Sequence, residues 1–185
     1  DYPGSIDTIG RGELGNRQLQ DLSTLSYARP NVSLDPVGTF KGVANFSIRG
    51  LGINSSIPSI DPAVGLFIDG VYQGINAGDV FDLLDVDQVD VLRGPQGVAF
   101  GRNTTGGAVL VHTADPTWEW EGHASMGYEG PVDSGRGTGM FTSRAVVSGP
   151  LSDRVAIRLG VLHSHDGGYF INSYDGSDFG KADTT

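Results

Sequence analysis

The stretch VDVLRGPQGVAFGRNTTGGAVLVHTADP, residues 89–116, decides the fold. It starts and ends with apolar runs typical of strands, and Gly, Pro, Asn and Thr lie between them. Pro95 stops the first ladder, GVAFG is consistent with one short helical turn, and Asn103 can hydrogen-bond local backbone. The glycines expected to give the backbone room here are Gly94, Gly101, Gly106 and Gly107. The pattern predicts two strands joined by a compact turn.

These glycines do not indicate a phosphate-binding loop. The chain has no Gly-x-x-x-x-Gly-Lys-Ser/Thr pattern, and GLGINS at 50–55 lacks both a third glycine and a following helical pattern. The 12 basic and 22 acidic residues leave a net charge of −10, which repels the phosphates of nucleic acids. We therefore expect neither nucleotide nor nucleic-acid binding.

The rest of the N-terminal part predicts a mixed α/β unit over residues 1–115. Leucines at helical spacing between Asn16 and Tyr27, followed by Pro30, predict one short amphipathic helix. Short β-like runs are separated by Gly, Pro, Asn and Ser clusters and lie at 43–48, 64–69, 87–92 and 108–113. The expected fold class of this part is α+β, mainly β.

Beyond residue 116 the pattern changes to strict alternation. In WEWEGHASMGYE, residues 118–129, apolar and aromatic side chains occupy the even positions and mostly polar ones the odd positions. Two further runs, 141–149 and 154–165, alternate in the same way. Sheets of soluble sandwiches also alternate. However, ten residues at ~3.3 Å, tilted ~40°, cover ~25 Å, which is the height of the apolar band of a membrane barrel. The aromatic residues expected at the two membrane interfaces are Trp118, Trp120 and Tyr128.

The connections support antiparallel transmembrane β-barrel strands. A long Gly-rich connection at 129–140, a short turn at 149–153 and a second long connection at 166–180 match the long outer loops and short periplasmic turns of such barrels. Three strands cannot close, and an open edge in lipid leaves backbone groups unsatisfied. We therefore expect residues 116–185 to be the start of an incomplete barrel and the chain to be a fragment.

Three motifs in order resemble the TonB-dependent outer-membrane receptors: FSIRGLG at 46–52, DPAVGLFIDGVYQG at 61–74, and the stretch at 89–116. The resemblance implies an N-terminal plug domain, residues 1–115, inside a 22-stranded barrel of the bacterial outer membrane. It implies energy-coupled uptake of a scarce nutrient, most commonly a ferric siderophore or other iron complex, without catalysis. The implied partners are TonB of the TonB–ExbB–ExbD complex, outer-membrane lipid and the nutrient. The short box that TonB binds is not recognisable in DYPGSIDTIG, so we expect it outside this sequence.

The resemblance also implies a plug–barrel latch. Arg49 and Arg93 match the arginines of the family's IRG and RGP motifs, which face the barrel wall and pair there with acidic residues. Those acidic partners would lie beyond residue 185. Gly50 follows Arg49 as a further turn glycine of the plug. Two solvated surface arginines are the alternative reading.

Ligand contacts are implied for apical plug loops at about 36–45, 51–62 and 72–79. Exposed aromatic, amide and charged groups there could contact a bound chelate or sugar. The candidates are Phe40, Lys41, Asn54, Ser55, Tyr72 and Gln73.

Other chemistry has weaker support. The aspartates at 82, 85, 87 and 90 match no EF-hand loop and are expected to form a solvated rim. The four histidines form no His-Glu-x-x-His arrangement, so we expect no metal and no other cofactor. Two alternatives stay open: a soluble periplasmic plug-like binding or signalling module, and a hydrolase that uses the aspartate cluster.

Overall fold

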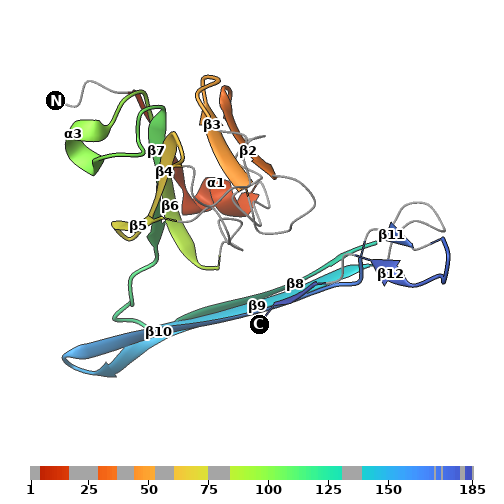
Figure 1. The fold of residues 1–185 in the computed structure, drawn as a ribbon. Coiled ribbons are helices and arrows are strands. Elements are labelled where there is room, and N and C mark those ends of the chain that lie inside the picture. Colours follow the sequence, from red (N-terminus) through yellow and green to blue (C-terminus); the bar gives the residue numbers. More distant parts are fainter. Residues whose placement is uncertain are drawn as a thin grey trace. The chain divides into compact units, whose positions relative to one another are not determined.

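The computed structural model describes residues 5–16, 29–36, 44–52, 61–74, 84–130, 139–168, 170–171, 173–179 and 182–184. The chain forms two compact units, residues 1–114 and residues 115–185. Figure 1 shows both as ribbons, and each is described by itself. Within the described residues, no helix has the length and apolar composition needed to cross a membrane.

The first unit is built on a five-stranded sheet with the order β1-β6-β7-β4-β5 (Figure 1). Its strands are β1 (Ser5–Gly10), β4 (Val64–Ile68), β5 (Val71–Gln73), β6 (Val86–Arg93) and β7 (Gly107–Thr113). Only β4 and β7 pair in parallel; the other neighbours are antiparallel. A separate antiparallel hairpin consists of β2 (Val32–Pro36) and β3 (Ala44–Ile48). Two short helices, α1 (Arg11–Asn16) and α3 (Gly97–Phe100), complete the described elements of this unit.

Apolar residues cover both faces of this sheet, because successive side chains of a strand point to opposite sides. The larger cluster combines one sheet face with the β2–β3 hairpin and α1. Its buried members are Ile9, Leu14, Val32, Leu34, Phe46, Ile48, Val64, Leu66, Val89, Val91, Val109 and Val111. The smaller cluster, on the other face, contains Phe67, Leu92 and Ala108. Strands β4 and β7 have apolar side chains packed on both sides, which explains why their sequences are near-continuous apolar runs, whereas β6 is more polar.

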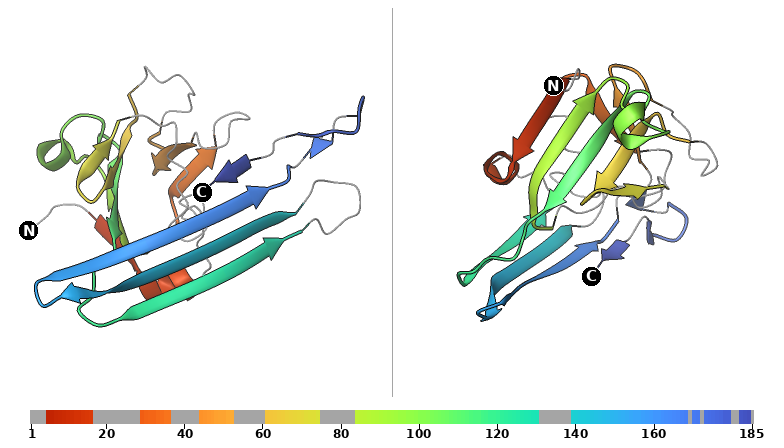
Figure 2. Two further views of the ribbon diagram at one scale, coloured as in Figure 1. Left: turned by 90° about the horizontal axis from the view of Figure 1, so that it is seen from below. Right: turned by 90° about the vertical axis from the view of Figure 1, so that its left-hand side faces the viewer.

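The second unit is an antiparallel sheet with the order β13-β10-β9-β8. Its strands are β8 (Glu121–Glu129), β9 (Met140–Ser152), β10 (Val155–Asp166) and the short β13 (Ala182–Thr184). The left view of Figure 2 shows the three long strands side by side. A small hairpin of β11 (Phe170–Ile171) and β12 (Asp178–Phe179) lies between β10 and β13 in the sequence.

The register of this sheet produces a continuous apolar face. Cross-strand rows bring together Gly122, Val147 and Leu159, and then Ala124, Ala145 and Val161. Met126 is 80% exposed and Val161 62% exposed, so this face has no protein cover among the described residues. Towards the far end the face becomes mixed, because the next rows end in His163 and His165.

The strands that the sequence predicted are present, but β1, β2, β5, β11, β12 and β13 were not predicted. All four β-like runs of the first unit and all three alternating runs of the second are strands, and GVAFG contains the short helix α3. The predicted short turn at 149–153 is wrong in extent. Strand β9 continues to Ser152, and the register shifts between Val155 and Ala156, so the reversal occupies only residues 153 and 154.

The helix prediction was only partly tested. Of the range from Asn16 to Tyr27, only Asn16 lies within the described residues, and it ends α1. Helix α1 itself was not expected, because RGELGN has two glycines and a single leucine and shows no helical period.

Candidate functional site

The turn at 94–107 is stabilised by its own backbone. The N–H of Gly94 donates to the carbonyl of Gly106 at 3.2 Å, and the N–H of Gln96 donates to the carbonyl of Thr104 at 2.9 Å. The buried Thr104 hydroxyl donates to the carbonyl of Gly101 at 2.8 Å. These three hydrogen bonds close the turn, and the groups that make them are bonded within the turn.

Gly107 is the position in this turn where only glycine fits. A Cβ there would lie 2.7 Å from Ile48 Cδ1, and it would come still closer to the carbonyl oxygen of Leu92. The structure places the other predicted turn glycines in turns or next to strand ends: Gly50, Gly94, Gly101 and Gly106.

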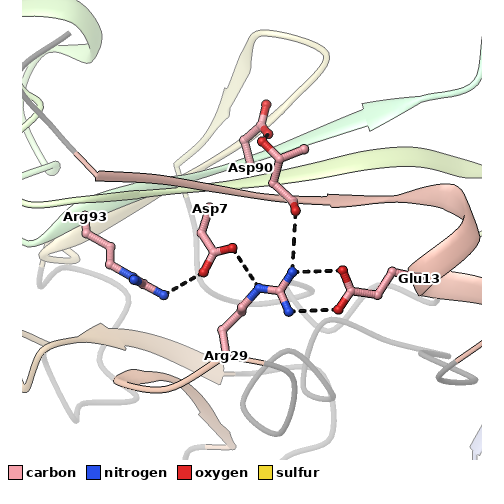
Figure 3. A network of polar contacts seen from close by, with 6 residues as sticks. Asp7, Glu13, Arg29, Asp90 and Arg93 are labelled. Carbon is pink, nitrogen blue, oxygen red and sulfur yellow. Dashed lines mark hydrogen bonds and ion pairs between the residues drawn. The ribbon is translucent and has the colours of Figure 1, made fainter.

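A network of charges joins the start of the chain to the sheet (Figure 3). The guanidinium of Arg29 donates to both carboxylate oxygens of Glu13 at 2.8 Å each, and its Nε donates to Asp7 at 2.8 Å. Arg93 Nη2 donates to the other oxygen of Asp7 at 2.7 Å. We call Asp7, Glu13, Arg29 and Arg93 the Arg29 clamp. Sequence reasoning missed it, because its members are up to 86 positions apart.

The clamp is partly buried. The side chains of Arg29 and Arg93 are each 16% exposed, Asp7 is 25% exposed and Glu13 is 32% exposed. The hydrogen bond with Glu13 raises the pKa of Arg29, burial opposes this effect, and Asp7 adds to it. Arg29 therefore stays charged, as arginine does throughout the ordinary pH range.

Arg93, one of the two predicted latch arginines, thus has a partner inside the first unit. Its Nε atom is nevertheless buried and has no hydrogen-bond partner among the described residues. Arg49, the other latch candidate, is exposed and has a left-handed backbone with φ 54°. The N–H of Arg49 donates to the carbonyl of Asn31 at 2.8 Å.

Asp90 connects three strands beside the clamp. It accepts hydrogen bonds from the Thr8 hydroxyl at 2.6 Å and from Gln88 Nε2 at 2.9 Å, and it lies 3.3 Å from His112 Nε2. Another aspartate of the predicted rim, Asp87, pairs with Arg11 at 3.2 Å. These aspartates thus make structural contacts instead of converging on one catalytic pocket.

Asp69 fixes the tight turn between β4 and β5. It accepts hydrogen bonds from the N–H of Thr113 at 2.9 Å and from the Thr113 hydroxyl at 2.8 Å. These bonds, the backbone one first, lower the pKa of Asp69 below its ordinary value of 3.8. Its left-handed φ of 47° is a conformation that aspartate tolerates better than most residues.

Two of the six predicted ligand contacts lie within the described residues. The Tyr72 hydroxyl accepts a hydrogen bond from Asn103 Nδ2 at 2.8 Å, and its ring lies 5.3 Å from the Phe67 ring. Gln73 Nε2 donates to the carbonyl of Val71 at 3.2 Å. The other four, Phe40, Lys41, Asn54 and Ser55, lie outside the described residues.

The aromatic residues of the second unit lie at the two ends of its apolar face. Trp118, Trp120 and Tyr128 are 59%, 65% and 72% exposed. The Trp120 ring covers the backbone of Gly149, and the Tyr128 ring covers that of Gly139, since a Cβ at either glycine would collide with the ring. Among the described residues, no group of three or more His, Asp or Glu side chains could hold a metal ion.

Comparisons with known proteins identify a matching family and similar sequences. The family model of the TonB-dependent receptor plug domain matches residues 1–108. The pesticin receptor of Yersinia pestis is 29% identical over 175 residues, which are 94% of this chain and 24% of that protein. An iron-regulated outer membrane virulence protein of Vibrio cholerae is 26% identical over 170 residues, covering 85% of this chain and 24% of that protein.

A solved structure resembles both units. The ferric yersiniabactin uptake receptor from Yersinia pestis has a TM-score of 0.81 at 27% sequence identity. The match covers 97% of this chain and 27% of that chain. The present chain therefore spans about a quarter of the length of the relatives it matches.

Proposed function

The chain belongs to the family of TonB-dependent receptor plug domains, and from this premise we propose that it is the plug and the first barrel strands of a receptor that imports a ferric siderophore. Its location is the bacterial outer membrane. The plug, residues 1–115, blocks the lumen of a 22-stranded barrel that begins at residue 116. Energy for uptake comes from TonB of the TonB–ExbB–ExbD complex, and the receptor carries out no bond chemistry.

The observation that carries this proposal is the two-faced sheet of β8, β9 and β10. A plug fold alone would also suit a soluble periplasmic module. This sheet has a face of exposed apolar rows with tryptophan at one end and tyrosine at the other. Such a face suits contact with lipid, with an aromatic residue at each membrane–water interface. A hydrolase has less support, because the aspartates of β6 make structural contacts. An iron complex as cargo is supported by the names of the relatives.

The proposal is tested by iron uptake. Cells that lack the receptor gene are compared with cells carrying the full-length receptor, using radioactive iron loaded on a panel of siderophores that includes yersiniabactin. Uptake of at least one complex should require the receptor and TonB, and should stop when the proton gradient is dissipated. A receptor that stays in the soluble periplasmic fraction and transports no member of the panel would contradict the proposal.

Tyr72→Ala and Gln73→Ala variants in the same assay test the described ligand candidates.

We also propose that Arg49 and Arg93 latch the plug to acidic residues of the barrel wall. The buried Nε of Arg93, without a partner among the described residues, supports this role, because a buried guanidinium nitrogen left unpaired is costly. Arg49→Ala in the full receptor should make the plug more sensitive to protease, whereas Arg93→Ala would also remove the contact with Asp7 inside the plug. Arg102→Ala, also at an exposed position, is the control for Arg49→Ala. Equal protease resistance of the two variants would remove support for the latch.

A further inference from the structure

The Arg29 clamp lies where the first described segment joins the sheet (Figure 3). This segment, Ser5–Asn16, consists of β1 and α1. Strand β1 is at the edge of the sheet and pairs only with β6 among the described strands. The segment can therefore leave without breaking the pairing of β6 with β7 or of β7 with β4.

Few apolar contacts fasten this segment. Ile9 and Leu14 are its two members in the core cluster, whereas Ile6 is 51% exposed. An edge strand with little buried apolar surface belongs to the low-stability end of a structure. Polar contacts consequently contribute a large share of what fastens β1 and α1 to the sheet.

The clamp is the most buried of these polar contacts, and it holds both halves of the segment at once. Asp7 lies on β1 and Glu13 on α1, and one guanidinium, that of Arg29, bonds to both. Arg93 of β6 bonds to the second oxygen of Asp7. Another ion pair between the segment and the sheet, Arg11 with Asp87, is far more exposed, at 48% and 56%.

We propose that the Arg29 clamp controls detachment of the Ser5–Asn16 segment as one unit from the plug sheet. Because Arg29 bonds to both elements, losing it loosens β1 and α1 together. Once detached and extended, the 12 residues could reach ~40 Å. The role of this release in transport rests on the proposed function, in which the coupling protein acts on the N-terminal side of the plug. The detachment itself does not depend on it.

Hydrogen exchange in the full-length receptor tests the proposal. In Arg29→Gln, amides of β1 should exchange about tenfold faster than in the wild type, which corresponds to about 1.4 kcal/mol. In Arg11→Gln, which removes the exposed ion pair of the same segment, the change should stay below about twofold. The amides of β4 and β7 should exchange at the wild-type rate in both variants.

Two results would overturn the proposal. One is unchanged exchange of β1 in Arg29→Gln. The other is equal acceleration in β1, β4 and β7, because that result would make the clamp a general stabiliser of the plug. Should Arg29→Gln fail to fold, Glu13→Gln is the substitute, because it removes only the α1 side of the clamp and leaves the contact with Asp7. In Glu13→Gln, hydrogen exchange of β1 should also be faster than in the wild type, by a smaller factor.

Salt gives a readout specific to an ionic contact. Raising the salt concentration from about 0.05 M to about 0.5 M should accelerate β1 exchange somewhat more in the wild type than in Arg29→Gln, because screening acts weakly on the partly buried clamp and acts on the exposed pair of Arg11 with Asp87 in both. An identical salt response in both would contradict an ionic clamp. The uptake assay separates this inference from the proposed function: accelerated β1 exchange in a receptor that imports no iron complex refutes only the transport proposal.

Discussion

At the scale of single residues, the turn at 94–107 depends most on Gly107. Its missing Cβ lets β7 start beside the carbonyl of Leu92 and the side chain of Ile48. Any side chain there must displace the Leu92 carbonyl of β6 or the buried Ile48 side chain of the β2–β3 hairpin. The glycine therefore sets the spacing between β6 and β7.

Gly107→Ala should destabilise the plug by about 1–3 kcal/mol, because it overpacks a site lined by backbone. Gly97→Ala is the matched control, since that position is exposed and a Cβ there meets nothing within 4 Å. The urea concentration at which the plug becomes protease-sensitive in the full receptor measures both effects. Equal midpoints would show that the sheet absorbs the extra methyl group.

At the scale of elements, the stability of the β4–β5 turn depends on pH because of Asp69. The folded pKa of Asp69 is lowered, so its charge stabilises the fold fully above the unfolded value near 3.8 and less as pH falls through the folded pKa. The contribution is modest, because Asp69 is exposed and solvent screens its charge.

Asp69→Asn should lower the thermal midpoint of the plug at pH 5 to 6, and the difference from the wild type should shrink as pH falls below about 4. Asparagine tolerates the same left-handed backbone, so the variant isolates the charge. Melting curves of the full receptor at several pH values measure this. A difference that stays constant with pH would rule out the carboxylate charge as the cause.

The elements differ in how well the sequence predicts them. Strands β4 and β7 were predictable because burial leaves continuous apolar runs in their sequences, and β8 was predictable because its apolar and polar side chains alternate, although all of them are exposed. Strands β1, β2 and β5 were not predicted. Helix α1 was not, because tertiary contacts, including Leu14 in the core, stabilise a segment with poor helix propensity.

The candidate site was less predictable than the fold. Asp7 and Arg93 become neighbours through the pairing of β1 with β6, and Arg29 reaches Asp7 from outside that sheet; nothing local in the sequence records either contact. Tyr72 was expected at a ligand loop, yet its hydroxyl already accepts a bond from Asn103. Local motifs identified the turn glycines, whereas the charge network required the sheet topology.

At the scale of the whole molecule, the apolar face of β8–β10 defines which side of the proposed barrel meets lipid. Ala124 lies in its central rows, and His123 next to it points to the opposite face. Neighbouring positions on one strand thus allow a comparison of the two faces with the same introduced charge.

Ala124→Lys should cost about 2–4 kcal/mol of stability in lipid vesicles, whereas His123→Lys should cost less than about 1 kcal/mol, because the first puts a charge into the hydrocarbon region. Urea titration of the folded fraction of the full receptor in vesicles measures the difference. Similar losses in both variants would contradict the assignment of the lipid-facing side.

The order of strands in the plug sheet also governs when it can form. Ser5 pairs with Arg93, and the parallel partner of β4 is β7, which ends at Thr113. Two of its three inner strands, β6 and β7, are thus synthesised last, and pairings this distant in sequence are slow to form. The stretch from Ser5 to Thr113 must therefore be synthesised before the sheet can close, and until β6 follows it β1 has no partner in this sheet.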